Sequence, residues 1–263
     1  MLIKGFLDVG RPRSSLQPHY MTAMVGTTAQ WARFETSFRK TKRSANILGP
    51  LHTTDLYHEM QEGRYSGDDW RTLWARFPND LRHLAFCGVL VLNQTDYDAT
   101  FPDHQARRAL SPNDSEFGVC FRYSLKTLVE EVLTRYRAQR PEIMLYVEKE
   151  QGAGVASNLW RAFSNECLPP NMRSMMEGVH LVPKGPSPLE AADMLAWKLG
   201  KFDTDPCLVT QVARSMAESS DAEMLPNAYR IDIGRNQLED LKAGLAFDAT
   251  TRRFKRHQAQ GSI

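Results

Sequence analysis

The sequence predicts an α/β domain with a mixed β-sheet flanked by helices. Two short apolar runs near its start, Leu2–Val9 and Tyr20–Gly26, are separated by a polar linker and are typical of a β-hairpin. Further along, apolar segments of strand length alternate with segments of helical periodicity. Because a hairpin is followed by alternating strands and helices, we expect both antiparallel and parallel strand pairs in one sheet.

The expected strands are apolar runs bounded by glycine, proline or polar residues. Leu84–Leu92 (LAFCGVLVL) is the most apolar window of the chain and is expected to lie inside the sheet. The five expected strands are Leu2–Val9, Tyr20–Gly26, Leu84–Leu92, Ile143–Val147 and Gly178–Pro183.

Helices are expected where apolar residues recur at spacings of three and four. Thr27 and Thr28 are suited to cap the first helix, which places Trp31, Phe34 and Phe38 on one face. The expected helices cover residues 29–43, 125–137, 154–166, 188–199, 208–219 and 236–245. Residues 51–82 are expected to form short helices or a surface excursion, and residues 93–116 a polar connection.

This order of elements predicts two units. Residues 1–205 are expected to form the α/β domain, and residues 206–263 a helical C-terminal extension that ends in a basic tail. The tail carries Arg252, Arg253, Lys255 and Arg256. It is expected either to contact a nucleic-acid backbone or to be a solvated chain end.

Composition and cysteine spacing argue against several kinds of site and segment. The 263 residues include 33 basic and 31 acidic side chains, so any contact with nucleic acid must come from a local patch. The four cysteines form no CxxC pair, which argues against a structural zinc site and a redox pair. The sequence shows neither a signal peptide nor an apolar run of the ~20 residues that a membrane helix needs. We therefore expect a cytoplasmic protein without membrane association.

Conventional nucleotide-binding and hydrolase motifs are absent, and the candidate site consists of acidic residues. Asp8 and Glu148 each come at the carboxyl end of an expected strand, where α/β proteins commonly build their sites. Alternatively, Asp8 caps the turn at Gly10 and Glu148 is a surface carboxylate.

Asp193 is the third candidate, because it lies in an otherwise small and apolar helix, AADMLAW. A partly buried carboxylate is costly unless it is paired, hydrogen-bonded or bound to a metal. Asp8, Glu148 and Asp193 could converge to bind Mg²⁺ or Mn²⁺ for phosphodiester cleavage.

A second cluster contains His52 and Asp55, which one helical turn would place together. They could transfer a proton or assist a metal site, or they could simply begin a helix with surface histidines. Nearby, Tyr65, Trp70, Trp74 and Phe77 are expected to be core residues, with a partner surface as the alternative.

The order of these segments resembles the family catalogued as domain of unknown function 3800, within the ribonuclease H-like superfamily. The resemblance covers roughly residues 1–200. It rests on Phe6-Leu7-Asp8, on His52 to Asp55, on Tyr146-Val147-Glu148, and most specifically on the helix around Ala192-Asp193. It implies a mixed five-stranded sheet flanked by helices, with Asp8, Glu148 and Asp193 as metal-binding acids and His52 and Asp55 as accessory residues.

The resemblance implies a metal-dependent nuclease that uses Mg²⁺ or Mn²⁺. Arg11, Arg13 and Lys198 are candidate contacts to the nucleic-acid backbone. The family usually has Asp-Glu-Ser/Thr-Gly at its first segment, where this chain has Asp8-Val9-Gly10. That departure keeps a second reading open: a catalytically degraded binding or effector subunit, for example in phage defence or a mobile element. A nuclease-like toxin controlled by a protein partner is a third.

Overall fold

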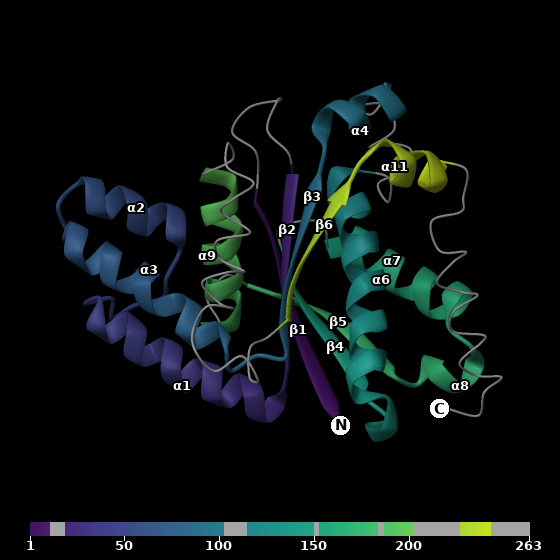
Figure 1. Ribbon diagram of the computed structural model, residues 1–263, viewed down its shortest axis with the longest axis horizontal. Coiled ribbons are helices and arrows are strands. Elements are labelled where there is room, and N and C mark those ends of the chain that lie inside the picture. Colours follow the sequence, from purple (N-terminus) through teal and green to yellow (C-terminus); the bar gives the residue numbers. More distant parts are fainter. Residues whose placement is uncertain (11–18, 103–114, 150–152, 184–186, 202–226, 243–263) are drawn as a thin grey trace.

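The computed structural model describes residues 1–10, 19–102, 115–149, 153–183, 187–201 and 227–242. These residues form a six-stranded mixed sheet with helices on both faces (Figure 1). An α/β architecture with a mixed sheet flanked by helices is therefore confirmed. The expected helix over 208–219 and the basic tail lie outside the described residues, as do Arg11, Arg13 and the side chain of Lys198.

The strand order of the sheet is β5-β4-β1-β2-β3-β6. β2 runs antiparallel to its neighbours β1 and β3, and the other three pairings are parallel. The carboxyl ends of β1 and β4 consequently meet at one end of the sheet. The strands are β1 (Leu2–Gly10), β2 (His19–Thr27), β3 (Phe86–Leu92), β4 (Glu142–Glu148), β5 (Met176–Val182) and β6 (Asn227–Ile233).

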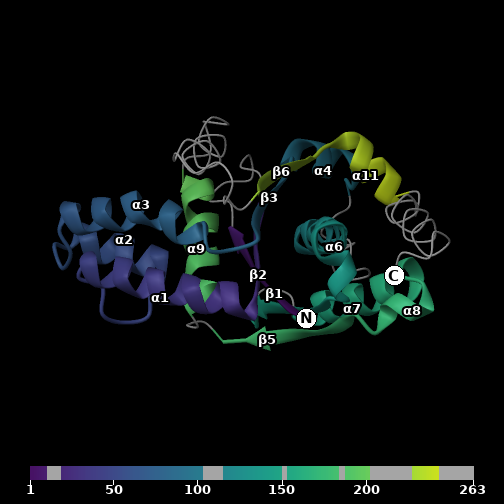
Figure 2. The same cartoon turned by 60° about the horizontal axis from the view of Figure 1, so that its bottom comes forward.

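Helices form a layer on each side of the sheet (Figure 2). One face is covered by α9 (Ser187–Lys201) and by the start of α1 (Thr28–Ser44), and α2 (Thr53–Gln61) and α3 (Gly67–Leu81) lie farther from the sheet. The other face is covered by α6 (Glu116–Tyr136) and α7 (Ala153–Ala162). The remaining helical segments are α4 (Gln94–Thr100), η2 (Arg137–Gln139), η3 (Phe163–Cys167), α8 (Pro170–Arg173) and α11 (Arg235–Lys242).

A hydrophobic cluster packs on each side of the sheet. Successive side chains of β1 point to opposite faces, so this strand contributes residues to both clusters. Ile3 and Leu7 face α6, whereas Phe6 belongs to the cluster around α1 and α9. Asp8, two residues after Phe6, therefore lies on the face that α9 covers. Within the described ranges, no helix has the length and apolar character needed to cross a membrane.

Local sequence explains most of these elements. Thr27 caps α1 in a capping box with Gln30, as its hydroxyl and position predict. All five predicted strands are present, and β3 lies between two other strands. Phe77 is buried, and Tyr65, Trp70 and Trp74 pack against the same cluster, which supports the core reading.

Three elements differ from the prediction. The helix α4 (Gln94–Thr100) lies within residues 93–116, where a polar connection was expected. α6 begins at Glu116 rather than near residue 125, because its first turns are buried on nearly every side and carry no helical periodicity. Residues 227–233 were expected to lie in a helical extension, but they form β6 and pair with β3. This strand lies at the edge of the described sheet; its sequence carries only a short alternation of apolar and polar residues, a weaker signal than the continuous apolar runs of the predicted strands.

The buried Asp80 joins α3 to α1, because the Ser37 hydroxyl donates to its Oδ1 at 2.5 Å. Burial raises the pKa of Asp80 above its ordinary value of 3.8, although hydrogen bonds from Ser37 and Thr41 act in the opposite direction. The folded state therefore favours the protonated carboxyl more than the unfolded state does. Its contribution to stability is complete below pH 3.8 and is lost as the pH rises through the raised folded pKa.

We expect Asp80→Asn to remove this pH-dependent loss, because an amide has no charged form. The free energy of unfolding, measured by urea denaturation between about pH 4 and about pH 7, should rise relative to wild type with increasing pH. A constant difference between the two proteins across this range would contradict the assignment.

Candidate functional site

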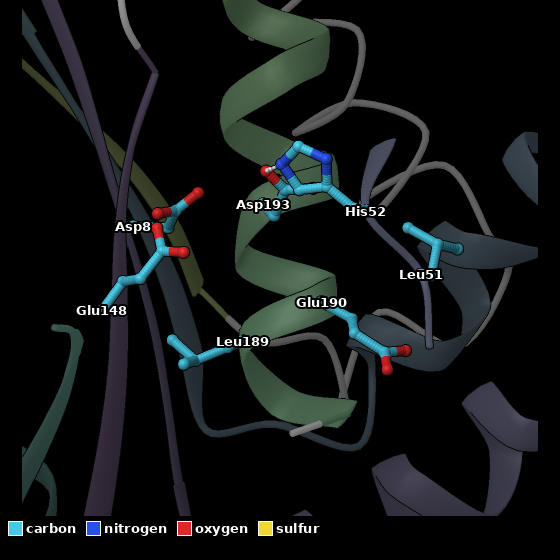
Figure 3. Close-up of a pocket in the computed structure, with 7 residues that line it drawn as sticks. All are labelled: Asp8, Leu51, His52, Glu148, Leu189, Glu190 and Asp193. Atoms are coloured by element: carbon cyan, nitrogen blue, oxygen red, sulfur yellow. Dashed lines mark ion pairs between the residues drawn. The ribbon is translucent and has the colours of Figure 1, made fainter. Parts of the chain in front are cut away.

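A small pocket, open to solvent, lies where the carboxyl ends of β1 and β4 meet α9. Four carboxylates, one imidazole and two leucines line it (Figure 3). The lining residues are Asp8, Leu51, His52, Glu148, Leu189, Glu190 and Asp193. The structure thus brings four of the five predicted site residues into one pocket, and the fifth, Asp55, contacts His52 beside it.

Asp8 and Glu148 form the wall of the pocket on the sheet side. Leu7 of β1 pairs with Val147 of β4, so Asp8 and Glu148 are the next residues along two adjacent parallel strands. Both residues are only 5% exposed. Figure 3 shows their carboxylates close to each other and on the side of the sheet that faces α9. Two neighbouring buried carboxylates are costly, which is typical of a site that binds a cation.

Asp193 reaches the pocket from α9, between buried apolar residues of the same helix. Its Oδ2 accepts a hydrogen bond of 2.7 Å from the backbone N–H of Thr53, the first residue of α2. The side chain is 22% exposed, so its other oxygen remains within reach of the pocket. The predicted partial burial of this carboxylate is confirmed.

His52 lies beside Asp193 (Figure 3), and it also contacts Asp55 of α2. Its Nδ1 is 2.9 Å from Asp55 Oδ2, and its Nε2 is 3.8 Å from Asp193 Oδ1. His52 immediately precedes α2 and Asp55 lies in the first turn, which is the proximity that their spacing predicts. Asp55 is 73% exposed and lies beside the imidazole, outside the pocket wall.

Glu190 was not among the predicted site residues, although it lines the pocket and is 4% exposed. Its Oε2 accepts a hydrogen bond from Lys42 Nζ of α1 at 2.7 Å. In Figure 3 its carboxylate points away from Asp8 and Glu148. One signal was available, since Glu190 precedes Asp193 by three residues and shares its helix face. No local sequence pattern indicates that Lys42 of α1 is its partner.

Two contacts hold α9 against the sheet beside the pocket. The buried Thr22 of β2, which pairs with Asp8, donates its hydroxyl hydrogen to the Ala192 carbonyl at 3.1 Å. At Gly10, a Cβ atom would lie 2.9 Å from the Ala196 carbonyl oxygen. Close approach, rather than backbone conformation, is therefore what requires glycine at position 10.

We expect Gly10→Ala to destabilise the protein by about 1 to 3 kcal/mol, because the new methyl group meets backbone and α9 must shift. Urea denaturation would measure the loss. Gly49→Ala is the matched control, since nothing lies within 4 Å of its added Cβ, and it should leave stability unchanged or slightly raised. If Gly10→Ala has the same free energy of unfolding as wild type, then α9 has room to move away from β1.

Cysteine chemistry has no place in this pocket. Cys87, Cys120 and Cys167 are buried, and burial raises the pKa of the Cys87 thiol to about 12. Thiolates are therefore disfavoured at neutral pH, as expected for core cysteines. Cys207 lies outside the described residues.

The donors in the pocket suit a hard divalent cation, because carboxylate oxygens are the ligands that Mg²⁺ prefers. Among the described residues, no three His, Cys, Asp or Glu side chains stand close enough to form a complete metal site. The fit therefore rests on the chemistry and burial of the donors, and Asp193 would have to approach Asp8 and Glu148 when a cation binds.

Comparison of the chain with protein-family models, with curated proteins and with solved structures found no match. The resemblance to the domain of unknown function 3800 family thus stays an expectation, carried by the segments around Asp8, His52, Glu148 and Asp193.

Proposed function

We propose that this protein is a metal-dependent nuclease that hydrolyses phosphodiester bonds in nucleic acid. One observation carries the proposal. Asp8 and Glu148, buried side by side at the ends of two parallel strands, share a pocket with Asp193 of the covering helix. Carboxylates from two strand ends and one helix are suited to hold Mg²⁺ or Mn²⁺ beside a phosphate.

The proposal includes a ribonuclease H-like fold. The arrangement of the first five strands supports it: β1, β2 and β3 form an antiparallel meander, and β4 and β5 extend the other side of β1 in parallel. This is a mixed sheet of the kind that the resemblance implies. β6 adds a sixth strand beyond β3.

In this mechanism Asp8, Glu148 and Asp193 would hold the cation, and Leu51 and Leu189 would form the apolar part of the pocket wall. When bound, the cation supplies positive charge beside the scissile phosphate and makes a nearby water more acidic. Without that charge, the carboxylates repel the phosphate.

His52 is the residue best placed to move a proton. Its Nε2 faces Asp193 at 3.8 Å, and the Asp55 carboxylate lies 2.9 Å from Nδ1 without the angles of a hydrogen bond. A neutral imidazole oriented in this way can accept a proton from the attacking water. In this mechanism Asp55 would act through His52, as a carboxylate placed 2.9 Å from its Nδ1.

A cleavage assay tests the proposal. Labelled single-stranded, duplex and RNA–DNA hybrid substrates are incubated with the full chain in Mg²⁺ or Mn²⁺, and with EDTA in place of the metal. We expect cleavage of at least one substrate class with metal and none with EDTA. Failure to cut any of the three with either metal would contradict the nuclease function.

A binding or effector subunit is the second candidate function. Val9 stands where the resembled family has glutamate, and the described carboxylates do not form a complete metal site as they stand. Thermal unfolding distinguishes the two readings, because a ligand that binds the folded state raises its stability. A nuclease should be stabilised by Mg²⁺ or Mn²⁺, whereas a degraded subunit should unfold at the same temperature with and without metal.

A further inference from the structure

Three rings from adjacent strands form a ladder beside the pocket. Phe6 of β1 pairs with Tyr146 of β4, and Tyr146 pairs with His180 of β5. The Phe6 and Tyr146 rings stack with centroids 4.5 Å apart and planes 8° apart. The Tyr146 and His180 rings stack at 5.4 Å and 25°. The ladder is thus a continuous stack across three strands.

Exposure rises along this ladder toward the edge of the sheet. Phe6 is buried under Trp31, Tyr146 is half-buried, and His180 is exposed. β5 is the last strand on this side of the described sheet. The inner face of the His180 ring is occupied by Tyr146, so the outer face is the one available to a ligand.

The ladder lies next to the acidic pocket and on the same face of the sheet. Asp8 and Glu148 follow Phe6 and Tyr146 by two residues, which corresponds to about 7 Å along a strand. That distance is comparable to the length of one nucleotide. On the opposite side of the ladder, Lys4 precedes Phe6 by two residues and also lies on this face, half-buried. A base stacked on the ladder would therefore lie between the ammonium group of Lys4 and the carboxylate pocket.

We propose that His180 stacks on an unpaired base of the nucleic acid whose neighbouring phosphate enters the pocket, an inference that rests on the proposed function. Every base has a π-face, so stacking on an aromatic ladder tolerates any sequence. Bases inside a duplex are already stacked on one another. The preferred substrate is therefore single-stranded at the position next to the cleaved bond.

Binding to two short fluorescent single strands tests this inference: oligo(dA), and an oligonucleotide with the same backbone and no bases. Both are titrated by fluorescence anisotropy in Mg²⁺ against the Asp193→Asn protein, which should cut only slowly and has one carboxylate fewer to repel the phosphate. In that background, His180→Ala should weaken binding of oligo(dA) about tenfold and leave binding of the abasic strand unchanged. His180→Trp should restore binding of oligo(dA), because it restores the stacking surface.

Leu181→Ala is the matched control, since Leu181 is the next residue of the edge strand, is 36% exposed and points to the opposite face. It should change neither titration. Equal weakening of both oligonucleotides by His180→Ala, or no weakening at all, would overturn the stacking site while leaving the nuclease proposal intact. If neither strand binds to any of these proteins and the cleavage assay is also negative, the proposed function fails together with the inference.

Discussion

Asp193→Asn is expected to lower metal-dependent cleavage by about a thousandfold, the equivalent of ~4 kcal/mol in the activation barrier. Asparagine has the size of aspartate, and its Oδ1 can still accept the hydrogen bond from the Thr53 N–H. What it lacks is the negative charge that a divalent cation requires. The rate with saturating substrate should fall, and added metal should not restore it.

Stability separates loss of a ligand from loss of structure. Because the Thr53 contact is retained, the melting temperature of Asp193→Asn should stay within a few degrees of wild type, a change of about 1 kcal/mol or less. Asp68→Asn, at a carboxylate on α3 that is 83% exposed, is the matched control and should cleave at the wild-type rate. A fully active Asp193→Asn protein would remove Asp193 from the metal site.

The central part of the fold was predictable because its physical signals are local. Leu84–Leu92 reads as a strand since nearly every residue in it is apolar, and it forms β3. Thr27 and Gln30 mark the start of α1 by their capping chemistry alone. β6 escaped prediction because its short alternation of apolar and polar residues is a weaker signal than the continuous apolar run of β3.

The difference between local and long-range signals decides which residues of the candidate site could be predicted. Asp8, Glu148 and Asp193 could be singled out because a carboxylate after an apolar strand, or within an apolar helix, is unusual by itself. Lys42 could not be singled out, because the sequence shows it only as one of several basic residues in α1. Its role depends on the ion pair with Glu190 of α9, which forms only in the folded protein. The stacking of Tyr146 on His180 likewise depends on the register between β4 and β5, which no short segment encodes.

Lys42→Met is expected to destabilise the protein by about 3 kcal/mol, because it leaves Glu190 buried without the ammonium group that now lies 2.7 Å away. The pair is 12% and 4% exposed and joins the last turn of α1 to the first turn of α9. Lys40→Met is the matched control, since Lys40 lies on the same helix and is exposed. It should change the free energy of unfolding by about 0.5 kcal/mol or less in urea denaturation.

The double variant Lys42→Met, Glu190→Gln distinguishes a buried charge from lost packing. If the unpaired carboxylate is the cause, neutralising it should restore much of the lost stability, although Met and Gln do not reproduce the ion pair. Since Glu190 and Asp193 lie one turn apart on α9, the single variant should also lower the cleavage rate per folded molecule, and the double variant should recover it in part. Wild-type stability in Lys42→Met would mean that the ion pair does not position α9. Among the described contacts, those of Thr22, Gly10, His52 and the Thr53 N–H would then hold Asp193 in the pocket.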